Sequence, residues 1–210
     1  MNRIPFIPTI IVGLAVALMI ALGCWQLFDR LPKKEAFLAQ LAVNPSRPPI
    51  AFPSIPTDKS LLFRRTGAFC LQPTSWKTEG AGRFGWRYIA QCRTGAEGPG
   101  FAVEMGISRD PNAKPQWRGG DVTGTIALAP AKRSLIGNLF STEPDTLMIV
   151  ADTPPPGFTR APRPKIDSIP NNHLAYGVQW FLFAAIAVGI YVLALRRKWR
   201  DTPAAPPPLN

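Results

Sequence analysis

The chain has 210 residues, a hydrophobic content of 46% and a formal net charge of +11, with 24 Lys and Arg against 13 Asp and Glu. This length is ample for one domain and short for two. The 3 cysteines are too few for a small disulfide scaffold, and basic residues scattered along the chain argue against a nucleic-acid-binding protein. The hydrophobic residues are concentrated in two runs, one near each end.

The first apolar run, residues 4–28, contains no charged residue and is long enough to cross the hydrocarbon core of a bilayer. We therefore expect a retained transmembrane helix here. The alternative is a cleaved signal peptide, because Ala21-Leu22-Gly23-Cys24 is similar to a lipoprotein cleavage site. Cleavage is disfavoured because the run exceeds a signal-peptide core of about 7–15 residues and Leu22 is large where a small residue is preferred.

Small residues and one amide mark possible contacts of this first helix. Gly13, Ala17 and Ala21 are spaced by four positions, so they form a stripe that lets another helix approach closely. We expect the second apolar run to pack on this stripe; packing against a separate membrane protein is the alternative. Gln26 lies at the outer end of the run, where a hydrogen bond to another helix would offset the cost of burying an amide.

The central segment, residues 29–170, is expected to form one small β-rich domain. After a short helical stretch at 35–41, residues 45–56 contain five prolines and are predicted to be a semi-rigid linker. Apolar stretches separated by Gly, Pro and Asn clusters predict five strands, at 62–71, 86–92, 101–108, 121–129 and 146–151. This spacing favours a small antiparallel sheet or a partly closed barrel over βαβ units.

Two cysteines and a second proline-rich segment complete the central domain. Cys70 and Cys92 fall in two of the predicted strands, and an oxidising compartment would permit them to pair. We expect the two residues to be close in space, and the bond itself is left open. Residues 153–170 are expected to lead back to the membrane as a linker without secondary structure.

The second apolar run predicts a second transmembrane helix, residues 171–195, because no charged residue lies between Leu174 and Leu195. The basic residues that follow place its end in the cytoplasm, so both termini are cytoplasmic and the central domain lies outside. Residues 196–210 are expected to be a cytoplasmic tail that is basic and then proline-rich, with disorder at 203–208. Gln179, inside this run, is a further candidate for hydrogen bonding between helices.

The only histidine of the chain, His173, lies where the second helix is expected to begin. On an ideal helix it shares a face with aromatic and small residues, namely Tyr176 or Gly177, Trp180 and Ala184. An imidazole in such surroundings could ligate the iron of a porphyrin. Alternatively, His173 forms a hydrogen bond near the helix start, and the aromatic residues are only interface anchors.

No enzyme site is predicted. A catalytic triad needs a base within hydrogen-bond reach of its nucleophile, and the only histidine is at the membrane edge. The sequence shows no Cys/His metal-ligand spacing and no phosphate-binding glycine loop. A weaker alternative is a redox enzyme that uses Cys70 and Cys92, but the pair lacks Cys-x-x-Cys spacing.

Two segments of the sequence resemble the surfeit locus protein 1 family. Leu22-Gly23-Cys24-Trp25-Gln26, followed by Arg30 and Lys33, resembles the Gly-x-Trp-Gln segment at the family's first span. Asn171-Asn172-His173-Leu174-Ala175-Tyr176 is similar to its Asn-Asn-His-Leu-x-Tyr segment, which opens the second span. The middle of the chain is less similar. Glu104 and Met105 replace Asn and Arg of the family's Val-Asn-Arg-Gly strand, and Asp29 stands where the family usually has Arg.

The resemblance implies a non-enzymatic assembly factor for haem-copper cytochrome c oxidase in the bacterial inner membrane, with a periplasmic central domain. Its implied partners are the catalytic subunit of the oxidase, the proteins that make and deliver haem a, and membrane lipid. His173 would be an axial ligand of transiently bound haem a, flanked by Trp25 and Tyr176, with Arg30 pairing the propionates. The alternative is a membrane scaffold that stabilises oxidase subunits without binding haem.

Overall fold

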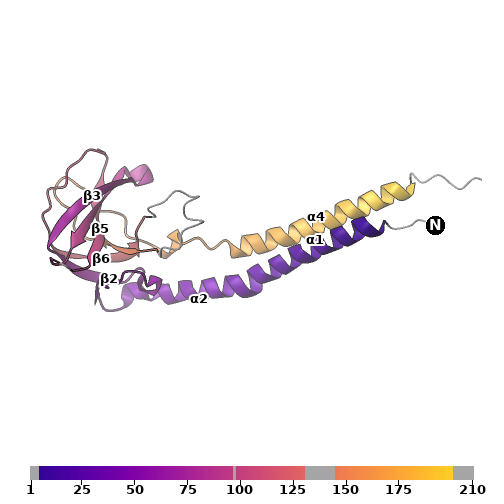
Figure 1. The fold of residues 1–210 in the computed structure, drawn as a ribbon, viewed down its shortest axis with the longest axis horizontal. Coiled ribbons are helices and arrows are strands. Elements are labelled where there is room, and N and C mark those ends of the chain that lie inside the picture. Colours follow the sequence, from indigo (N-terminus) through magenta and orange to yellow (C-terminus); the bar gives the residue numbers. More distant parts are fainter. Residues whose placement is uncertain (1–4, 97, 131–144, 201–210) are drawn as a thin grey trace, which may run out of the picture. The chain divides into compact units, whose positions relative to one another are not determined.

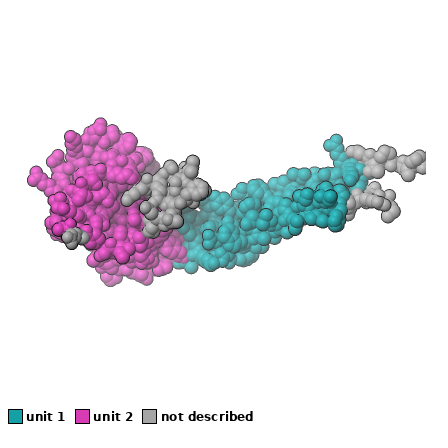
Figure 2. All heavy atoms as spheres, viewed as in Figure 1, with its two compact units in different colours: residues 1–36, 170–210 teal, residues 37–169 magenta. Residues whose placement is uncertain are grey.

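The structure, a computed structural model, describes residues 5–96, 98–130 and 145–200 (Figure 1). The chain divides into two compact units (Figure 2). Unit 1 is built from the two ends of the chain, residues 1–36 and 170–210, and unit 2 from residues 37–169.

Unit 1 consists of two long apolar helices that lie side by side (Figure 1). α1 (Phe6–Trp25) is followed directly by a π-helical turn, Gln26–Arg30, and then by α2 (Leu31–Ala42). α4 covers His173–Arg200. By length and composition α1 and α4 are able to cross a membrane, and little of their apolar surface is buried in protein. The prediction of a long apolar helix near each end is confirmed.

The ends of these helices differ from the predicted boundaries. Helical structure continues past residue 28 to Ala42, which includes the helical stretch predicted at 35–41. α4 also continues through the basic residues to Arg200, so the first part of the predicted tail is helical. Helix formation does not stop where the apolar run stops, because Lys, Arg and Glu are themselves good helix formers. Residue 4 and the proline-rich residues 203–208 lie outside the described residues.

Unit 2 contains a seven-stranded sheet with the order β1-β2-β6-β7-β5-β4-β3. The strands are β1 (Ile50–Ala51), β2 (Arg65–Cys70), β3 (Gln72–Gly80), β4 (Trp86–Arg93), β5 (Gly100–Ser108), β6 (Gly120–Leu128) and β7 (Leu147–Ala151). β1 runs parallel to β2 and β5 parallel to β7, whereas the other neighbours are antiparallel. The prediction of a purely antiparallel sheet is wrong, because β7 inserts between β5 and β6.

Three segments of unit 2 differ from their predicted structure. β3 was not expected, because it lies at the edge of the sheet with mostly exposed side chains and so has no clear apolar alternation. The predicted linker 45–56 includes β1 and adjoins a short 3-10 helix, Asn44–Ser46. The predicted linker 153–170 contains a 3-10 turn, Ile166–Ser168, and a β-bridge between Thr159 and Ile107. Backbone groups in these segments are satisfied by neighbouring strands, which proline content alone does not exclude.

The sheet curls back on itself. Only Leu71 separates β2 from β3, although β3 forms one edge of the sheet and β2 lies next to the other. The two edges therefore approach each other, and the Leu71 N–H donates a hydrogen bond to the Arg93 carbonyl at 2.9 Å. We call this curled mixed sheet the barrel, although its edge strands β1 and β3 are not hydrogen-bonded to each other.

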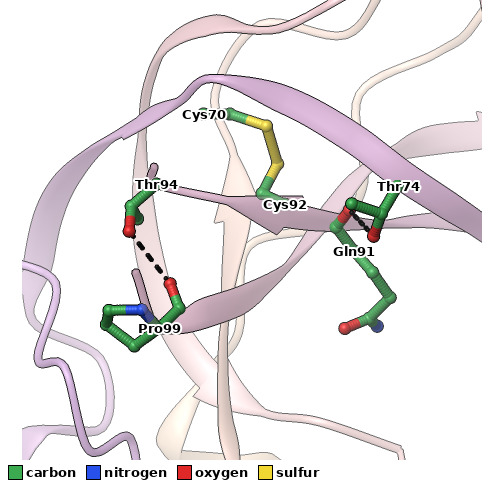
Figure 3. The surroundings of a disulfide bond; sticks show 6 residues. All are labelled: Cys70, Thr74, Gln91, Cys92, Thr94 and Pro99. Carbon is green, nitrogen blue, oxygen red and sulfur yellow. Dashed lines mark hydrogen bonds between the residues drawn. A yellow bond between two sulfur atoms is a disulfide. The ribbon is translucent and has the colours of Figure 1, made fainter. Parts of the chain in front are cut away.

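A disulfide joins Cys70 and Cys92 where the sheet closes, with 5.3 Å between their Cα atoms (Figure 3). β2 and β4, which carry these cysteines, are not hydrogen-bonded neighbours. The expected proximity is present, but it comes from the curl of the sheet rather than from adjacent antiparallel strands. Both cysteines belong to the interior core of the barrel, with Val103, Met105 and Ile149.

A second core cluster lies on the other face of the sheet, and a third lies where α2 ends. The outer cluster contains Ile89, Ile107, Ala127, Met148, Val150 and Ala161. In the third cluster Leu41 is fully buried against Leu62, Phe63, Ile126 and Leu147. The buried Asn44 side chain fastens the chain beside it by donating to the Ser60 and Leu62 carbonyls at 2.6 and 2.8 Å.

Candidate functional site

The candidate site lies in unit 1, where α1 and α4 meet, and we call this contact the helix seam. Less exposed positions recur along α1 at spacings of three and four, which is the pattern of one helix face; they are Thr9, Val12, Val16, Met19, Gly23 and Gln26. Towards the N-terminal end of α1, the Thr9 and Tyr191 hydroxyls form a hydrogen bond. Near the other end of α1, the helix seam contains two glycines, an amide and the imidazole of His173.

Two glycines allow the helices to approach closely. A Cβ at Gly23 would lie 2.9 Å from the ring of Phe181, and a Cβ at Gly177 would lie 2.6 Å from Cδ2 of Leu27. Both distances are shorter than side chains tolerate, so each position requires glycine or a shift of its neighbour. In the two turns of α4 that follow His173, the helix seam is therefore closely packed and leaves no room for a porphyrin between the helices.

The stripe predicted from spacing is not used in this contact. Gly13, Ala17 and Ala21 are all exposed, and a Cβ added at Gly13 would meet nothing within 4 Å. The expectation that α4 packs on them is wrong, because Gly23 lies on a different face of α1, and that face allows the closer approach. Gln179 is also exposed and has no hydrogen-bond partner among the described residues, so it does not join α4 to α1. Contact of these residues with a separate membrane protein stays a prediction.

The central contact of the site joins His173 to Gln26. His173 Nδ1 lies 2.8 Å from Oε1 of Gln26. An amide oxygen only accepts hydrogen bonds, so Nδ1 carries a proton and donates, and in the neutral ring the lone pair is on Nε2. The imidazole is half-buried, and Nε2 has no hydrogen-bond partner within the described part of the chain. A histidine held by one ring nitrogen, with the other free, has the arrangement found in histidine ligands of metals.

The local helix geometry supports this contact. Gln26 is the first residue of the π-helical turn Gln26–Arg30, which interrupts the α-helical pattern between α1 and α2. Such turns are uncommon and often occur at functional sites. Sequence reasoning identified Gln26 and His173 separately, but it predicted neither their pairing nor the π turn.

The remaining predicted site residues lie elsewhere on the helices. Trp25 precedes Gln26 and therefore lies about 100° further around the helix. Its ring is 45% exposed, and the guanidinium of Arg30 lies 4.9 Å from the ring centroid. Tyr176 is 50% exposed. The structure thus divides the predicted set into a His173–Gln26 pair and a Trp25–Arg30 pair. The expectation that Trp25 and Tyr176 flank a bound haem stays a prediction.

The part of the chain that the structure describes contains no cluster of three or more His, Cys, Asp or Glu side chains that could hold a metal ion. A metal at this site would therefore have to arrive within a ligand that supplies its other coordination bonds. An iron porphyrin is such a ligand.

A family model described as the SURF1 family matches residues 13–185. The chain belongs to the SURF1 family. The matched range covers most of α1, all of unit 2 and α4 as far as residue 185, and this agrees with the resemblance found in the two end segments. SURF1 family proteins are associated with cytochrome oxidase assembly and are assembly factors rather than catalytic enzymes. A comparison with curated proteins finds no match.

Proposed function

We propose that this SURF1 family protein assists the delivery or insertion of haem a into the catalytic subunit of cytochrome c oxidase and binds the haem transiently. In this proposal α1 and α4 span the inner membrane of a bacterium, both termini are cytoplasmic and unit 2 is periplasmic. The observation that carries the proposal is the His173–Gln26 contact, because it holds an imidazole with a free Nε2 at the start of an apolar helix.

Each residue of the site has a distinct role in this proposal. Haem iron, when bound, would accept the Nε2 lone pair of His173 as an axial ligand. Gln26 is a positioning residue, since it fixes the tautomer and the orientation of the ring. The guanidinium of Arg30 lies over the Trp25 ring, and its N–H groups would pair with a haem propionate. Tyr176, exposed on α4, would place the edge of its side-chain ring against the apolar macrocycle of the haem.

A scaffold function is the second candidate, and a specific observation favours it. The stripe Gly13, Ala17 and Ala21 and the amide Gln179 are exposed on the helices and take no part in the helix seam. Small residues and amides in a membrane span are typical contacts with a neighbouring helix. These residues would then contact a membrane subunit of the oxidase, without any contribution from haem.

The visible spectrum of the full chain, purified from cells that make haem a, distinguishes the two functions. The proposal expects a haem band in the wild-type protein, none with His173→Ala, and partial recovery with His173→Met, because a thioether also ligates haem iron. A haem-free wild-type protein, together with normal oxidase assembly in the His173→Ala strain, would overturn haem delivery and favour the scaffold.

A further inference from the structure

A group of charged side chains lies in unit 2, where β7 ends. Asp152 directly follows β7, and its N–H donates to the Thr123 carbonyl at 2.9 Å. Three arginines surround its carboxylate, and we call them the arginine cluster: Arg65 in β2, and Arg160 and Arg163 in the segment after β7.

Arginine side chains contact both oxygens of the Asp152 carboxylate. Arg65 donates to Oδ2 of Asp152, and its other terminal nitrogen lies 3.4 Å from the Thr125 hydroxyl. Arg160 donates to Oδ1, and Arg163 Nη2 lies 3.6 Å from the same oxygen. Three separate guanidinium groups are therefore held around a single anion.

The backbone that carries Arg160 is fixed to the sheet on both sides of that residue. Thr159 and Ile107 exchange two backbone hydrogen bonds, at 2.8 and 2.9 Å. Ala161 is buried in the outer cluster, among Ile107 and Val150. Arg163 follows two residues later. The cluster is thus positioned before any ligand arrives, which lowers the entropy that binding would lose.

The cluster carries more positive charge than its carboxylate neutralises. The hydrogen bond from Arg65, and then the charges of all three arginines, lower the pKa of Asp152 against the opposing effect of burial. Asp152 is therefore ionised at neutral pH, and three guanidiniums against one carboxylate leave an excess of two positive charges. Each guanidinium has about five N–H donors, whereas one carboxylate has about four acceptor sites.

Two of the three arginine side chains are exposed to solvent. The Arg160 and Arg163 side chains are 41% and 63% exposed, whereas Asp152 is only 16% exposed. A purely structural link between the sheet and the segment after β7 would need one arginine, and Arg160 alone already provides it. Arg163, the most exposed of the three, adds charge without a close contact to Asp152.

We propose that the arginine cluster is a binding site for a phosphate monoester group. A monoester carries about two negative charges at neutral pH, which would neutralise the excess, and arginine forks bind such oxyanions through paired N–H groups. A group with a single charge would leave the cluster half neutralised. Two sources share this chemistry: a soluble phosphate monoester and the headgroup of phosphatidic acid. The site is separate from His173 and does not depend on the proposed haem function.

The test measures binding of inorganic phosphate to the full chain in phosphatidylcholine nanodiscs, through ³¹P line broadening. We expect saturable binding by the wild-type protein and roughly tenfold or greater weakening by Arg160→Gln/Arg163→Gln, since two charge-assisted hydrogen bonds are lost. The matched control is Arg109→Gln, which removes one exposed arginine of unit 2 that has no ion pair among the described residues. Arg163→Gln alone keeps the Arg65 and Arg160 pairs, so it should weaken binding without changing the unfolding midpoint.

A second arm identifies the source. Nanodiscs that contain phosphatidic acid, in phosphate-free buffer, should protect the backbone amides of residues 158–161 and of Arg163 from hydrogen exchange if the lipid headgroup is the ligand. Protection by added inorganic phosphate alone would indicate a soluble monoester. The proposal is overturned if neither form of phosphate affects the wild-type protein, or if Arg163→Gln and the double variant bind as tightly as wild type does. Those results would show that the cluster only fastens the segment after β7.

Discussion

His173 Nδ1 and Gln26 Oε1 lie 2.8 Å apart, and this hydrogen bond joins the first residue of α4 to the π turn after α1. Its consequence is chemical as well as structural, because a donating Nδ1 leaves Nε2 as the basic nitrogen. In the proposed function, Gln26 would thereby set the ligand properties of His173 without contacting the ligand itself.

Replacement of Gln26 should therefore weaken haem binding without removing the axial ligand. We expect Gln26→Ala to lower haem affinity by roughly 10-fold or more, the range found when hydrogen-bond partners of metal ligands are removed. Gln179→Ala is the matched control, since that amide belongs to the same pair of helices but is exposed and unpaired in the described structure. Haem titration of the purified full chain measures both. Equal affinities for the two variants would contradict the positioning role of Gln26.

The close approach of the helices predicts that Gly177 cannot be enlarged without loss of stability. Gly177→Ala would place a methyl group against Cγ and Cδ2 of Leu27, at 2.8 and 2.6 Å. Overpacking of this kind costs about 1–3 kcal/mol. Unfolding of the helix pair, followed by circular dichroism during titration with denaturing detergent, should shift to lower detergent concentration.

Gly13→Ala and Gly189→Ala are the matched controls for this prediction. Neither position has an atom within 4 Å of the added Cβ, and alanine is the better helix former. Both variants should unfold at the same detergent concentration as wild type or above it. A larger loss with Gly13→Ala than with Gly177→Ala would mean that the exposed stripe, and not Gly177, forms the helix contact.

The disulfide predicts a redox-dependent stability of unit 2. Cys70 and Cys92 are separated by 22 positions in the sequence. In the chain-entropy model, a bond that closes a loop of this length raises the free energy of unfolding by about 3 kcal/mol. Cys70→Ser/Cys92→Ser should lower the urea midpoint of unit 2, and reductant should have no further effect on that variant. In unreduced native protein, an alkylating reagent should modify neither cysteine, whereas Cys24 is a free thiol. Labelling of Cys70 or Cys92 under those conditions would refute the bond.

The two long helices could be predicted from the sequence, but the faces through which they pack could not. Charge-free length identified α1 and α4 correctly, because it depends only on composition. Spacing by four identified Gly13, Ala17 and Ala21 as one helix face of small residues. Such spacing does not show which neighbouring helix packs on that face. The faces that pack contain Gly23 on α1 and Gly177 on α4, and the spacing pattern identified neither glycine as a contact.

For the sheet too, the local sequence predicts individual strands but not how they pair. Strands with buried faces, such as β5 and β7, are visible as apolar runs. β3 is polar because it is an edge strand, so its sequence carries no burial pattern. The position of β7 between β5 and β6 depends on pairing across distant parts of the chain. No local pattern encodes that pairing, and it is what makes the sheet mixed.

Glu104 gives a prediction about pH. Its side chain is buried in β5, with Arg87 Nη1 at 3.7 Å. Burial raises the pKa of Glu104 above its ordinary value; the charge of Arg87 opposes this and the charge of Glu79 adds to it. The folded state therefore binds its proton more tightly than the unfolded state does. At pH values below the unfolded pKa, the Glu104 carboxyl is protonated in both states and costs no stability. As pH rises from the unfolded pKa through the raised folded pKa, its ionisation lowers the free energy of unfolding, and this loss is complete above the folded pKa.

Glu104→Gln keeps the shape of the side chain and removes its ionisation. We expect the variant to be more stable than wild type at neutral pH and to differ little from it at pH values below the unfolded pKa. Urea unfolding of the full chain at a series of pH values measures the difference. Asp121→Asn, which removes an exposed carboxylate from the same unit, should give a difference that is small and nearly constant with pH. If the Glu104→Gln protein were instead less stable at neutral pH, the ion pair with Arg87 would outweigh the penalty of burying the carboxylate.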